Sequence, residues 1–412
     1  MRHAYRSAHP PHHTPLFRIL GAGTLLLLLG AAEVQAIPAF ARKYKVSCAL
    51  CHNPVPTLTE FGNAFAGNGF RFASNEPPRD TVDTNDDLLD LMKDLPLALR
   101  MDIYGQTFTN GETAPEFQAP YNIKILTGGP ISRKISYYLY FFLFERGEIG
   151  GIEDAYIYID DIGGGPYDLM IGQFQVSDPM FKRELRLTFA DYVIYRTRVG
   201  DQVADLTYDR GILGIASPGS FTISAEVING NGIAGADLER RLDNDPFKNF
   251  FAHVTSPVIP ELRLGVMGYY GRQRGQQTET APEVTNNLWM AGADATLALG
   301  LLELNLQYIH REDDQPTFQS DESKAKTDGG FAEAIYRFRG GRWYAIALYN
   351  LIHCSEPLLD VRLGAPPGIS RFQQLTLGGG HVLKRNIRLM GELAVDFEQD
   401  FTRWTLGIVT AF

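Results

Sequence analysis

The chain has 412 residues, with 38 Lys and Arg against 48 Asp and Glu, and a formal net charge of −10 at pH 7. This acidity argues against a nucleic-acid partner, which would require a basic face. An acidic surface instead suits cations or basic proteins. The only cysteines are Cys48, Cys51 and Cys354, which excludes a fold held together by several disulfides.

The first 36 residues have the pattern of a secretory signal peptide. Arginines make a basic start, and an apolar run follows from Ile19 to Ala32. Val34-Gln35-Ala36 offers small side chains for cleavage before Ile37. The apolar run is short for a membrane-spanning helix, and an uncleaved anchor is the alternative. We therefore expect the protein to mature outside the cytoplasm.

The pentad Cys48-Ala49-Leu50-Cys51-His52 has the Cys-x-x-Cys-His pattern of a c-type haem attachment site. Both thiols can bond to one haem, and the adjoining His52 then becomes the proximal iron ligand. The alternatives are a chance match, a local disulfide and half of a zinc site. A zinc site needs further ligands nearby, but the next such residues are His253 and Cys354. A thioredoxin-like site would need a βαβ context, which the sequence lacks.

Residues 37–94 combine the pentad with helical patterns, which predicts a small cytochrome segment. Pro56 can open a helix, because the first helical turn does not use its missing N–H. Leu58, Phe61 and Phe65 then recur on one helix face, where they would cover a haem. The same side chains would equally make an ordinary helix core.

A second axial ligand is less well marked than the first. Met92, in an expected helix over Asp86–Lys93, is the nearest candidate, although a lone Met is more often a packing residue. Met101 is expected to face outwards. Met267 and Met390 are expected inside the barrel, where they could reach a haem placed there.

From Leu95 to Phe412 the pattern is β throughout. It predicts about sixteen strands, each about long enough to cross a bilayer when tilted. The expected strands are residues 95–109, 117–127, 134–146, 151–162, 167–177, 204–217, 219–230, 248–258, 261–274, 285–299, 301–312, 327–339, 342–353, 370–384, 386–399 and 401–412.

The connections alternate between tight turns and long polar loops, as in outer-membrane barrels. Several strands also alternate between apolar and polar residues: Trp404, Leu406 and Ile408 share one face. On the preceding strand, Arg388 and Glu392 are expected to point inwards. A soluble β-sandwich or propeller is the alternative. A barrel with an even strand number would have both of its ends on the short-turn, periplasmic side.

The stretch Pro38–Arg42, the pentad, and Pro56–Gly62 with Phe65 together resemble the fused monohaem cytochrome–porins of the bacterial outer membrane. The best-known members of this family oxidise iron(II). The motif resemblance covers about 30 residues, while the architectural resemblance covers the mature chain. It implies an all-β, sixteen-stranded barrel that follows a small helical cytochrome, with heme c on Cys48 and Cys51 and iron bound by His52.

This resemblance leads us to expect an electron conduit in the outer membrane of a Gram-negative bacterium. An extracellular donor, Fe²⁺ above all, would reduce the haem, and a periplasmic c-type cytochrome would take the electron. The protein would then be either an iron(II) oxidase or a non-enzymatic carrier, and flow could also run outwards. Glu312, Asp313, Asp314, Asp321 and Glu322 could attract Fe²⁺ or simply be solvated. A solute channel plugged by the haem segment is the second class of function, and haem sensing or uptake is the third.

Overall fold

The structure is a computed structural model that describes residues 39–72, 82, 84–89, 91, 93, 95–109, 115–278, 280–319, 324–361, 367–399 and 401–412. The expected signal peptide, residues 1–36, lies outside the described residues. The same holds for Met92, the candidate distal ligand, and for the loop carboxylates Asp321 and Glu322.

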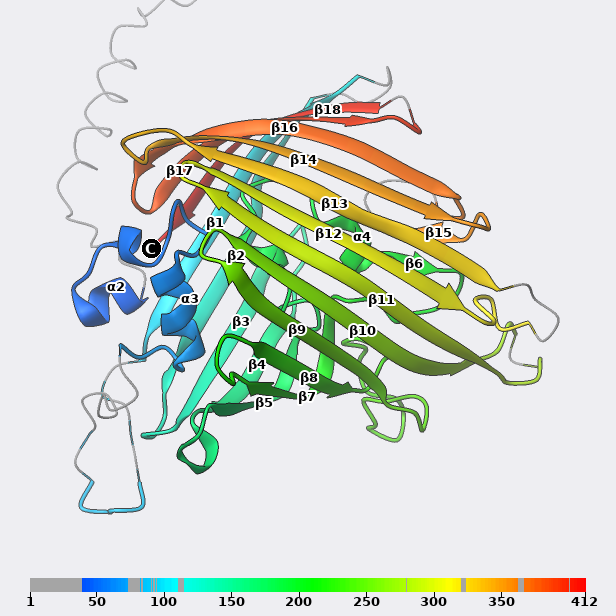
Figure 1. Cartoon of the computed structure of the whole chain (residues 1–412), viewed down its shortest axis with the longest axis horizontal. Helices are drawn as coiled ribbons and strands as arrows, with labels where there is room; N and C mark the ends of the chain where they lie inside the picture. Colours follow the sequence, from blue (N-terminus) through cyan, green and yellow to red (C-terminus); the bar gives the residue numbers. More distant parts are fainter. Residues whose placement is uncertain are drawn as a thin grey trace, which may run out of the picture. The chain divides into compact units, whose positions relative to one another are not determined.

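In the described part of the chain, sixteen antiparallel strands form one closed barrel, and β1 closes the ring against β18 (Figure 1). This confirms the predicted fold, and the predicted strands overlap the observed ones throughout. The barrel strands are β1 (Leu97–Phe108), β2 (Glu116–Pro130), β3 (Ile135–Glu145), β4 (Ile152–Ile159), β5 (Tyr167–Gln175), β7 (Tyr208–Ala216), β8 (Thr222–Ile228), β9 (Asn249–Ile259), β10 (Leu262–Gly275), β11 (Val284–Leu299), β12 (Leu302–Asp313), β13 (Ala325–Arg337), β14 (Trp343–Cys354), β16 (Arg371–Lys384), β17 (Ile387–Asp396) and β18 (Phe401–Ala411).

The strand faces alternate as predicted, with apolar residues outside and polar ones inside. On β18, Trp404 and Leu406 are 51% and 72% exposed on the outer wall. On β17, Arg388 and Glu392 are buried inside the barrel. Met390, also predicted to face inwards, is buried there as well. Because successive strand residues point to opposite faces, this alternation gives the barrel an apolar wall around a polar interior.

The two ends of the barrel differ in their connections, which also confirms the prediction. At one end, the short-turn end, the connections are residues 131–134, 160–166, 217–221, 260–261, 300–301, 338–342 and 385–386. At the other, the long-loop end, they include residues 176–207, 229–248, 314–324 and 355–370. Leu99 and Phe412 exchange backbone hydrogen bonds of 2.7 and 2.8 Å, so both barrel termini lie at the short-turn end.

The connection between β5 and β7, residues 176–207, folds into the barrel, and we call it the inner loop. It contains η3 (Arg183–Leu185), α4 (Val193–Arg196) and β6 (Arg198–Val199), and Figure 1 shows α4 and β6 within the ring of strands. Tyr192 donates a hydrogen bond of 3.0 Å to Glu333 of β13. The side chain of Asn350, on β14, bonds to the backbone of Val193 and Asp191 at 3.1 and 3.0 Å. The inner loop therefore crosses the lumen to the wall opposite its own strands.

A second long connection reaches the inner loop from the long-loop end. Residues 355–370 contain β15 (Leu359–Asp360), which pairs antiparallel with β6 in a separate two-stranded sheet. Leu359 and Val199 are fully buried in this contact. Neither of these short strands was predicted, since two residues carry no periodic pattern.

The N-terminal segment is helical, as expected, with α2 (Ala39–Tyr44), η1 (Cys48–Leu50) and α3 (Glu60–Gly67). The prediction that Pro56 opens the long helix is wrong. The helix α3 begins at Glu60, because the hydroxyl of Thr59 accepts the N–H of Gly62 at 3.1 Å and caps the helix there. Leu58 therefore lies before the helix and not on its face.

The helix expected over Asp86–Lys93 is also wrong, as far as the described residues show. The backbone of Leu89 donates to the carbonyl of Asp86 at 3.0 Å, and the N–H of Leu88 donates to the Asp86 carboxylate. An Asp side chain that binds the backbone in this way favours a turn over a helix. Among the described residues, none of the helices has the length and apolarity needed to cross a bilayer.

Asn350→Ala should loosen the inner loop. The change leaves the N–H of Val193 and the carbonyl of Asp191 buried without their partner, at a cost of about 1–3 kcal/mol for each group. Hydrogen exchange followed by mass spectrometry should then show faster exchange over residues 190–196. Asn287→Ala, which removes a contact with Asp314 at the long-loop end, is the control and should leave that region unchanged. Equal protection in both variants would contradict the role given to Asn350.

Candidate functional site

The pentad forms a single helical turn at the start of the described chain. The backbone N–H groups of Cys51 and His52 both donate to the carbonyl of Cys48, at 3.2 and 2.9 Å. Residues three apart on such a turn lie on the same side, so Cys48 and Cys51 face the same way and His52 adjoins them. Both thiols are half-buried and free of a disulfide.

The thiols do not have the properties of a redox-active dithiol. Burial raises the pKa of Cys48 and of Cys51 above the ordinary value, although the charge of Arg385 acts against this on Cys48. Catalytic dithiols depend on a lowered thiol pKa, which makes the nucleophilic thiolate at neutral pH. The local environment thus disfavours the thioredoxin-like alternative.

His52 is held in the form that binds a metal. Its Nδ1 lies 3.0 Å from the carbonyl oxygen of Pro56 and donates to it, which leaves Nε2 as the unprotonated nitrogen. Metal-binding histidines are commonly oriented by such a bond from the other ring nitrogen. Burial lowers the pKa of His52, and the backbone of Pro56 and Thr57 acts in the opposite direction. The net lowering favours the neutral imidazole that iron requires.

The helix α3 packs directly against the pentad. The N–H of Thr59 donates to the carbonyl of Cys51 at 2.8 Å, and its hydroxyl donates to the carbonyl of Leu50 at 2.8 Å. Gly62 lies so close that a Cβ there would stand 2.3 Å from the carbonyl oxygen of Cys51. A glycine is therefore required at this contact.

An aromatic cluster surrounds α3. Its members, in contact through ring centroids 4.2–6.2 Å apart, are Phe40, Tyr44, Phe61, Phe65, Phe70 and Phe72. Phe65 is buried at its centre, but Phe61 and Phe72 remain 38% and 40% exposed, and so does Leu50 of the pentad, at 38%. An apolar body bound at the pentad would cover these partly exposed side chains. The residues present thus fit a haem bound at the pentad.

The segment is joined to the barrel by contacts at the short-turn end. Arg71, only 1% exposed, forms an ion pair of 2.5 Å with Asp160 in the β4–β5 turn. Tyr158 of β4 donates to the carbonyl of Gly67 at 2.8 Å, and Phe70 stacks on Tyr138 of β3.

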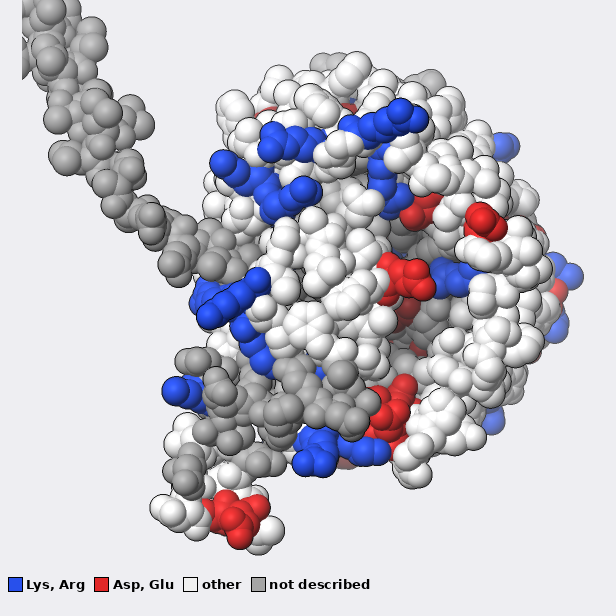
Figure 2. All heavy atoms as spheres, turned by 60° about the vertical axis from the view of Figure 1, so that its left-hand side comes forward, with Lys and Arg blue, Asp and Glu red and all other residues white. Residues whose placement is uncertain are grey.

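Two further bonds lie next to the pentad itself. Arg337, at the end of β13, donates to the carbonyl of Asn53 at 2.8 Å. The hydroxyl of Thr57 donates to the carbonyl of Leu185 in the inner loop at 3.0 Å. The segment therefore touches the lumen as well as the rim, and Figure 2 shows that the surface is hollowed beside it.

The carboxylates of the long loops that might have bound Fe²⁺ are already paired where the structure describes them. Glu312 forms an ion pair with Lys326 at 3.2 Å, and Asp314 forms one with Lys324 at 2.8 Å. Asp313 is buried against Arg311 at 2.7 Å. These pairs match the simpler interpretation of the loop as a solvated surface.

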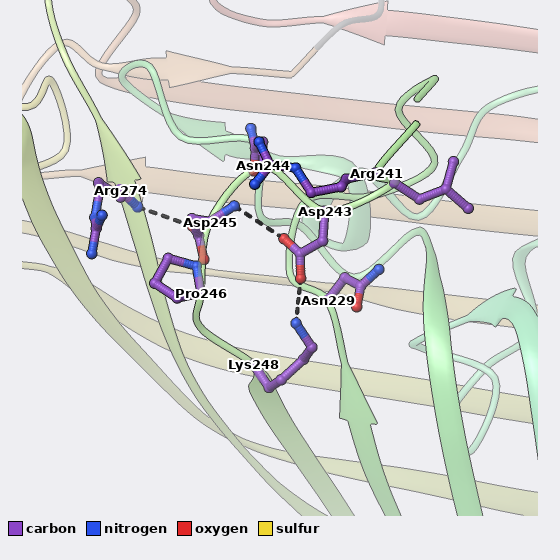
Figure 3. Close-up of a pocket in the computed structure, with 9 residues that line it drawn as sticks. Asn229, Arg241, Asp243, Asn244, Asp245, Pro246, Lys248 and Arg274 are labelled. Atoms are coloured by element: carbon purple, nitrogen blue, oxygen red, sulfur yellow. Dashed lines mark hydrogen bonds and ion pairs between the residues drawn. The ribbon is translucent and has the colours of Figure 1, made fainter. Parts of the chain in front are cut away.

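A pocket at the long-loop end has the same internally paired character (Figure 3). Asp243 pairs with Lys248 and accepts the N–H of Asp245 at 3.2 Å, and Asp245 accepts the N–H of Arg274 at 3.0 Å. These polar groups bind one another. The described residues that line the pocket include neither a cysteine nor a histidine. Its lining residues are Asn229, Arg241, Leu242, Asp243, Asn244, Asp245, Pro246, Lys248 and Arg274.

Sequence reasoning found the pentad and part of the aromatic cluster but missed two positioning groups. The carbonyl oxygen of Pro56 accepts the hydrogen bond from His52, and no pattern of side chains predicts this backbone contact. Gly62 is required by a close approach, and a single glycine in a helical pattern gives no such indication. Leu58 contributes through a backbone bridge to His52.

No protein-family model and no curated protein matches the chain. Solved structures do. An anion-selective porin from Comamonas acidovorans matches with a TM-score of 0.54 and 14% identity, over 77% of this chain and 99% of that one. The outer membrane channel DcaP of Acinetobacter baumannii matches with a TM-score of 0.53 and 11% identity, over 77% and 97%. At these identities the likeness establishes a porin-like fold.

Gly62→Ala should disrupt the site, and Gly67→Ala should not. The first substitution forces a Cβ against the carbonyl of Cys51, so α3 has to move away from the pentad. The second adds a Cβ with nothing within 4 Å, on the same helix. Limited proteolysis of the intact protein should cut within residues 45–70 faster for Gly62→Ala than for wild type. If both variants resist proteolysis equally, α3 does not depend on the close contact.

Proposed function

We propose that this protein is an outer-membrane electron conduit, a member of the fused monohaem cytochrome–porins that its N-terminal residues resemble. The observation that carries the proposal is the oriented His52, whose Nδ1 bond to Pro56 leaves Nε2 available beside two thiols on one turn. Cys48 and Cys51 would hold the haem covalently, and His52 would bind its iron. When bound, a c-type haem supplies reversible one-electron chemistry.

Around that group the chain's own residues have separable tasks. Phe61, Phe72 and Leu50 would cover apolar haem surface and exclude water. Thr59 and Gly62 hold α3 against the pentad, so the covering face keeps its position. Phe65 would support this arrangement from the centre of the aromatic cluster, and Leu58 would support it from outside the cluster. Met92 remains the candidate distal ligand.

The proposed orientation follows the build of outer-membrane barrels, whose short turns face the periplasm. The segment would then lie at the periplasmic mouth, and both barrel termini would be periplasmic. The signal peptide expected over residues 1–36 would take the chain across the inner membrane. The exposed outer wall, with Trp404 and Leu406, would meet lipid.

The position of the pentad restricts the donor. A donor bound at the long-loop end would stand roughly 25 Å away, the height of the apolar band of such barrels. A donor must therefore be small enough to enter the lumen, and Fe²⁺ is. Fe²⁺ would lose one electron and become Fe³⁺, the haem iron would gain that electron, and a soluble periplasmic c-type cytochrome would accept it. The reverse flow, towards an extracellular acceptor, uses the same path.

Replacing both Cys48 and Cys51 by Ala (C48A/C51A) should abolish covalent haem, while Cys354→Ala should retain it. Cys48 and Cys51 would each supply one of the two thioether bonds, and Cys354 is fully buried at the end of β14. Haem staining after denaturing electrophoresis measures the covalent attachment directly. In stopped flow, the oxidised wild type and Cys354→Ala should develop a reduced α-band on mixing with Fe²⁺.

The possible outcomes separate the parts of the proposal. If dithionite reduces the haem but Fe²⁺ does not, the proposal of an electron conduit stands and Fe²⁺ is excluded as its donor. Staining that is equal in C48A/C51A and wild type, or absent from both, would overturn the haem assignment.

A solute channel is the second candidate, favoured by the inner loop and by the charges within the lumen. Inside the barrel, Arg183 pairs with Asp191, and Arg403 pairs with Glu392 at 3.2 Å. The matched structures include proteins described as a channel and as an anion-selective porin, with which this chain shares the fold. In planar bilayers, a channel should conduct ions equally as wild type and as C48A/C51A. No conductance in either protein would remove this candidate.

A further inference from the structure

The short-turn end carries exposed basic side chains that have no ion-pair partner among the described carboxylates. Among the described residues, none of these side chains forms an ion pair with Asp or Glu: Lys45, Arg133, Lys134, Arg339, Arg342, Lys384 and Arg385. Figure 2 shows Lys and Arg side chains spread across this side of the molecule. We call these residues the basic rim.

At the long-loop end, most of the described basic side chains have acidic partners, although Arg240 and Arg272 form no ion pair with a described carboxylate and Arg272 lies over the ring of Phe247. The ion pairs are Arg146–Glu145, Arg241–Asp237, Lys248–Asp243, Arg274–Glu283, Lys324–Asp314, Lys326–Glu312 and Arg371–Glu398. Among the described residues, more unpaired basic side chains thus lie at the short-turn end than at the long-loop end, although the chain has a net charge of −10.

The acidic residues of the short-turn end do not cancel the basic rim. Asp160 is occupied by the buried Arg71, and Glu303 is occupied by Arg337 at 2.9 Å. The remaining described carboxylates near this end include Glu60, Asp86, Asp87, Asp161, Asp168 and Glu261. Asp161 and Asp168 gather with Asp160 at the β4–β5 turn. By contrast, Arg339 with Arg342 and Lys384 with Arg385 sit on two other turns, which flank the neighbouring strands β14 and β16.

The basic rim borders the pentad. Arg385 is close enough to Cys48 for its charge to act on the thiol. Arg337, next to the turn that carries Arg339, donates to the carbonyl of Asn53, one residue beyond His52. On the other side, Arg71 of the segment donates to the carbonyl of Arg133. Positive charge therefore lies around the place where an electron would leave the protein.

We propose that the basic rim is the docking surface for an acidic, soluble one-electron carrier protein. The inference rests on the proposed function, because the carrier would exchange electrons at the pentad. Complementary charge steers two proteins together and raises the association rate by about tenfold or more, an effect that salt screens. The overall acidity of the chain suggested a basic partner, but the distribution of charge in the fold reverses that expectation at the periplasmic mouth.

The test uses the whole protein in nanodiscs of phosphatidylcholine, which carries no net charge. The probes are plastocyanin, a small acidic copper protein, and mitochondrial cytochrome c, a small basic one. The variant R339E/R342E/K384E/R385E reverses four charges of the basic rim. The control R240E/R241E/R272E/R274E makes the same change in net charge at the long-loop end, where these arginines are exposed. Heat-modifiable mobility in gel electrophoresis verifies that each barrel is folded, and K384Q/R385Q replaces the variant if it is not.

Biosensor association rates are measured at about 10 mM and about 0.15 M ionic strength, where the Debye length falls from about 30 to about 8 Å. We expect plastocyanin to bind wild type and control at low salt, and to associate at least about tenfold more slowly with the rim variant or at high salt. Cytochrome c should show no preference for wild type over the rim variant. Equal plastocyanin rates for all proteins, or an equal loss in rim variant and control, would overturn the proposal.

Two further readings distinguish the remaining explanations. Loss of binding to phosphatidylglycerol vesicles in the rim variant, with unchanged plastocyanin binding, would make the rim a lipid-headgroup contact and overturn the docking proposal. The haem spectrum is recorded on the same samples. Rim-dependent plastocyanin binding by a protein without covalent haem would support the docking surface and refute the proposed electron conduit.

Discussion

Closure of the barrel is the constraint on which the rest of the structure depends. A backbone N–H or carbonyl in an apolar surrounding needs a hydrogen-bond partner, and a sheet meets this need only when its two edges pair. Here β1 and β18 supply that last ladder, down to the mutual bonds of Leu99 and Phe412. An even number of antiparallel strands then puts both barrel termini at one end. The N-terminal segment, which leads into β1, therefore joins the barrel at the short-turn end.

That placement decides what the segment touches. Arg71 is almost fully buried, and a buried charge is tolerated only with a close partner, which Asp160 provides. The same end brings the pentad beside the inner loop through Thr57 and Leu185. The segment is too short to form a substantial core of its own, so packing against the barrel stabilises it. Under the proposed function, a haem at the pentad would cover the apolar side chains that the segment leaves exposed.

The inner loop makes the lumen of the barrel narrower and more highly charged. By crossing to β13 and β14 it narrows the lumen and lines it with paired charges such as Arg183 and Asp191. A narrowed, charged passage suits the movement of a small ion better than the entry of a protein. Under the proposed function, a soluble carrier would meet the pentad from the short-turn side, where the basic rim lies.

The sequence by itself determined the features that depend on residues close together along the chain. The two-residue alternation, visible on β17 and β18, specified the barrel, its strands and its faces, because one wall of each strand is apolar and the other polar. The pentad predicts which residues would bind a haem, because three ligating groups stand within five positions. Local rules failed where a side chain competed with the backbone, as Thr59 and Asp86 do, and the helix boundaries moved accordingly.

Only the tertiary structure decided how distant parts combine. The carbonyl of Pro56 orients His52 because a turn brings it there, and Gly62 is required because α3 approaches the pentad, not because of its own helix. The inner loop finds Asn350 across the barrel, more than a hundred positions along the chain. The basic rim is spread over separate turns, so no run of sequence reveals it. Such features depend on which distant residues the closed barrel brings together. The residue pattern along the chain carries no information about those contacts.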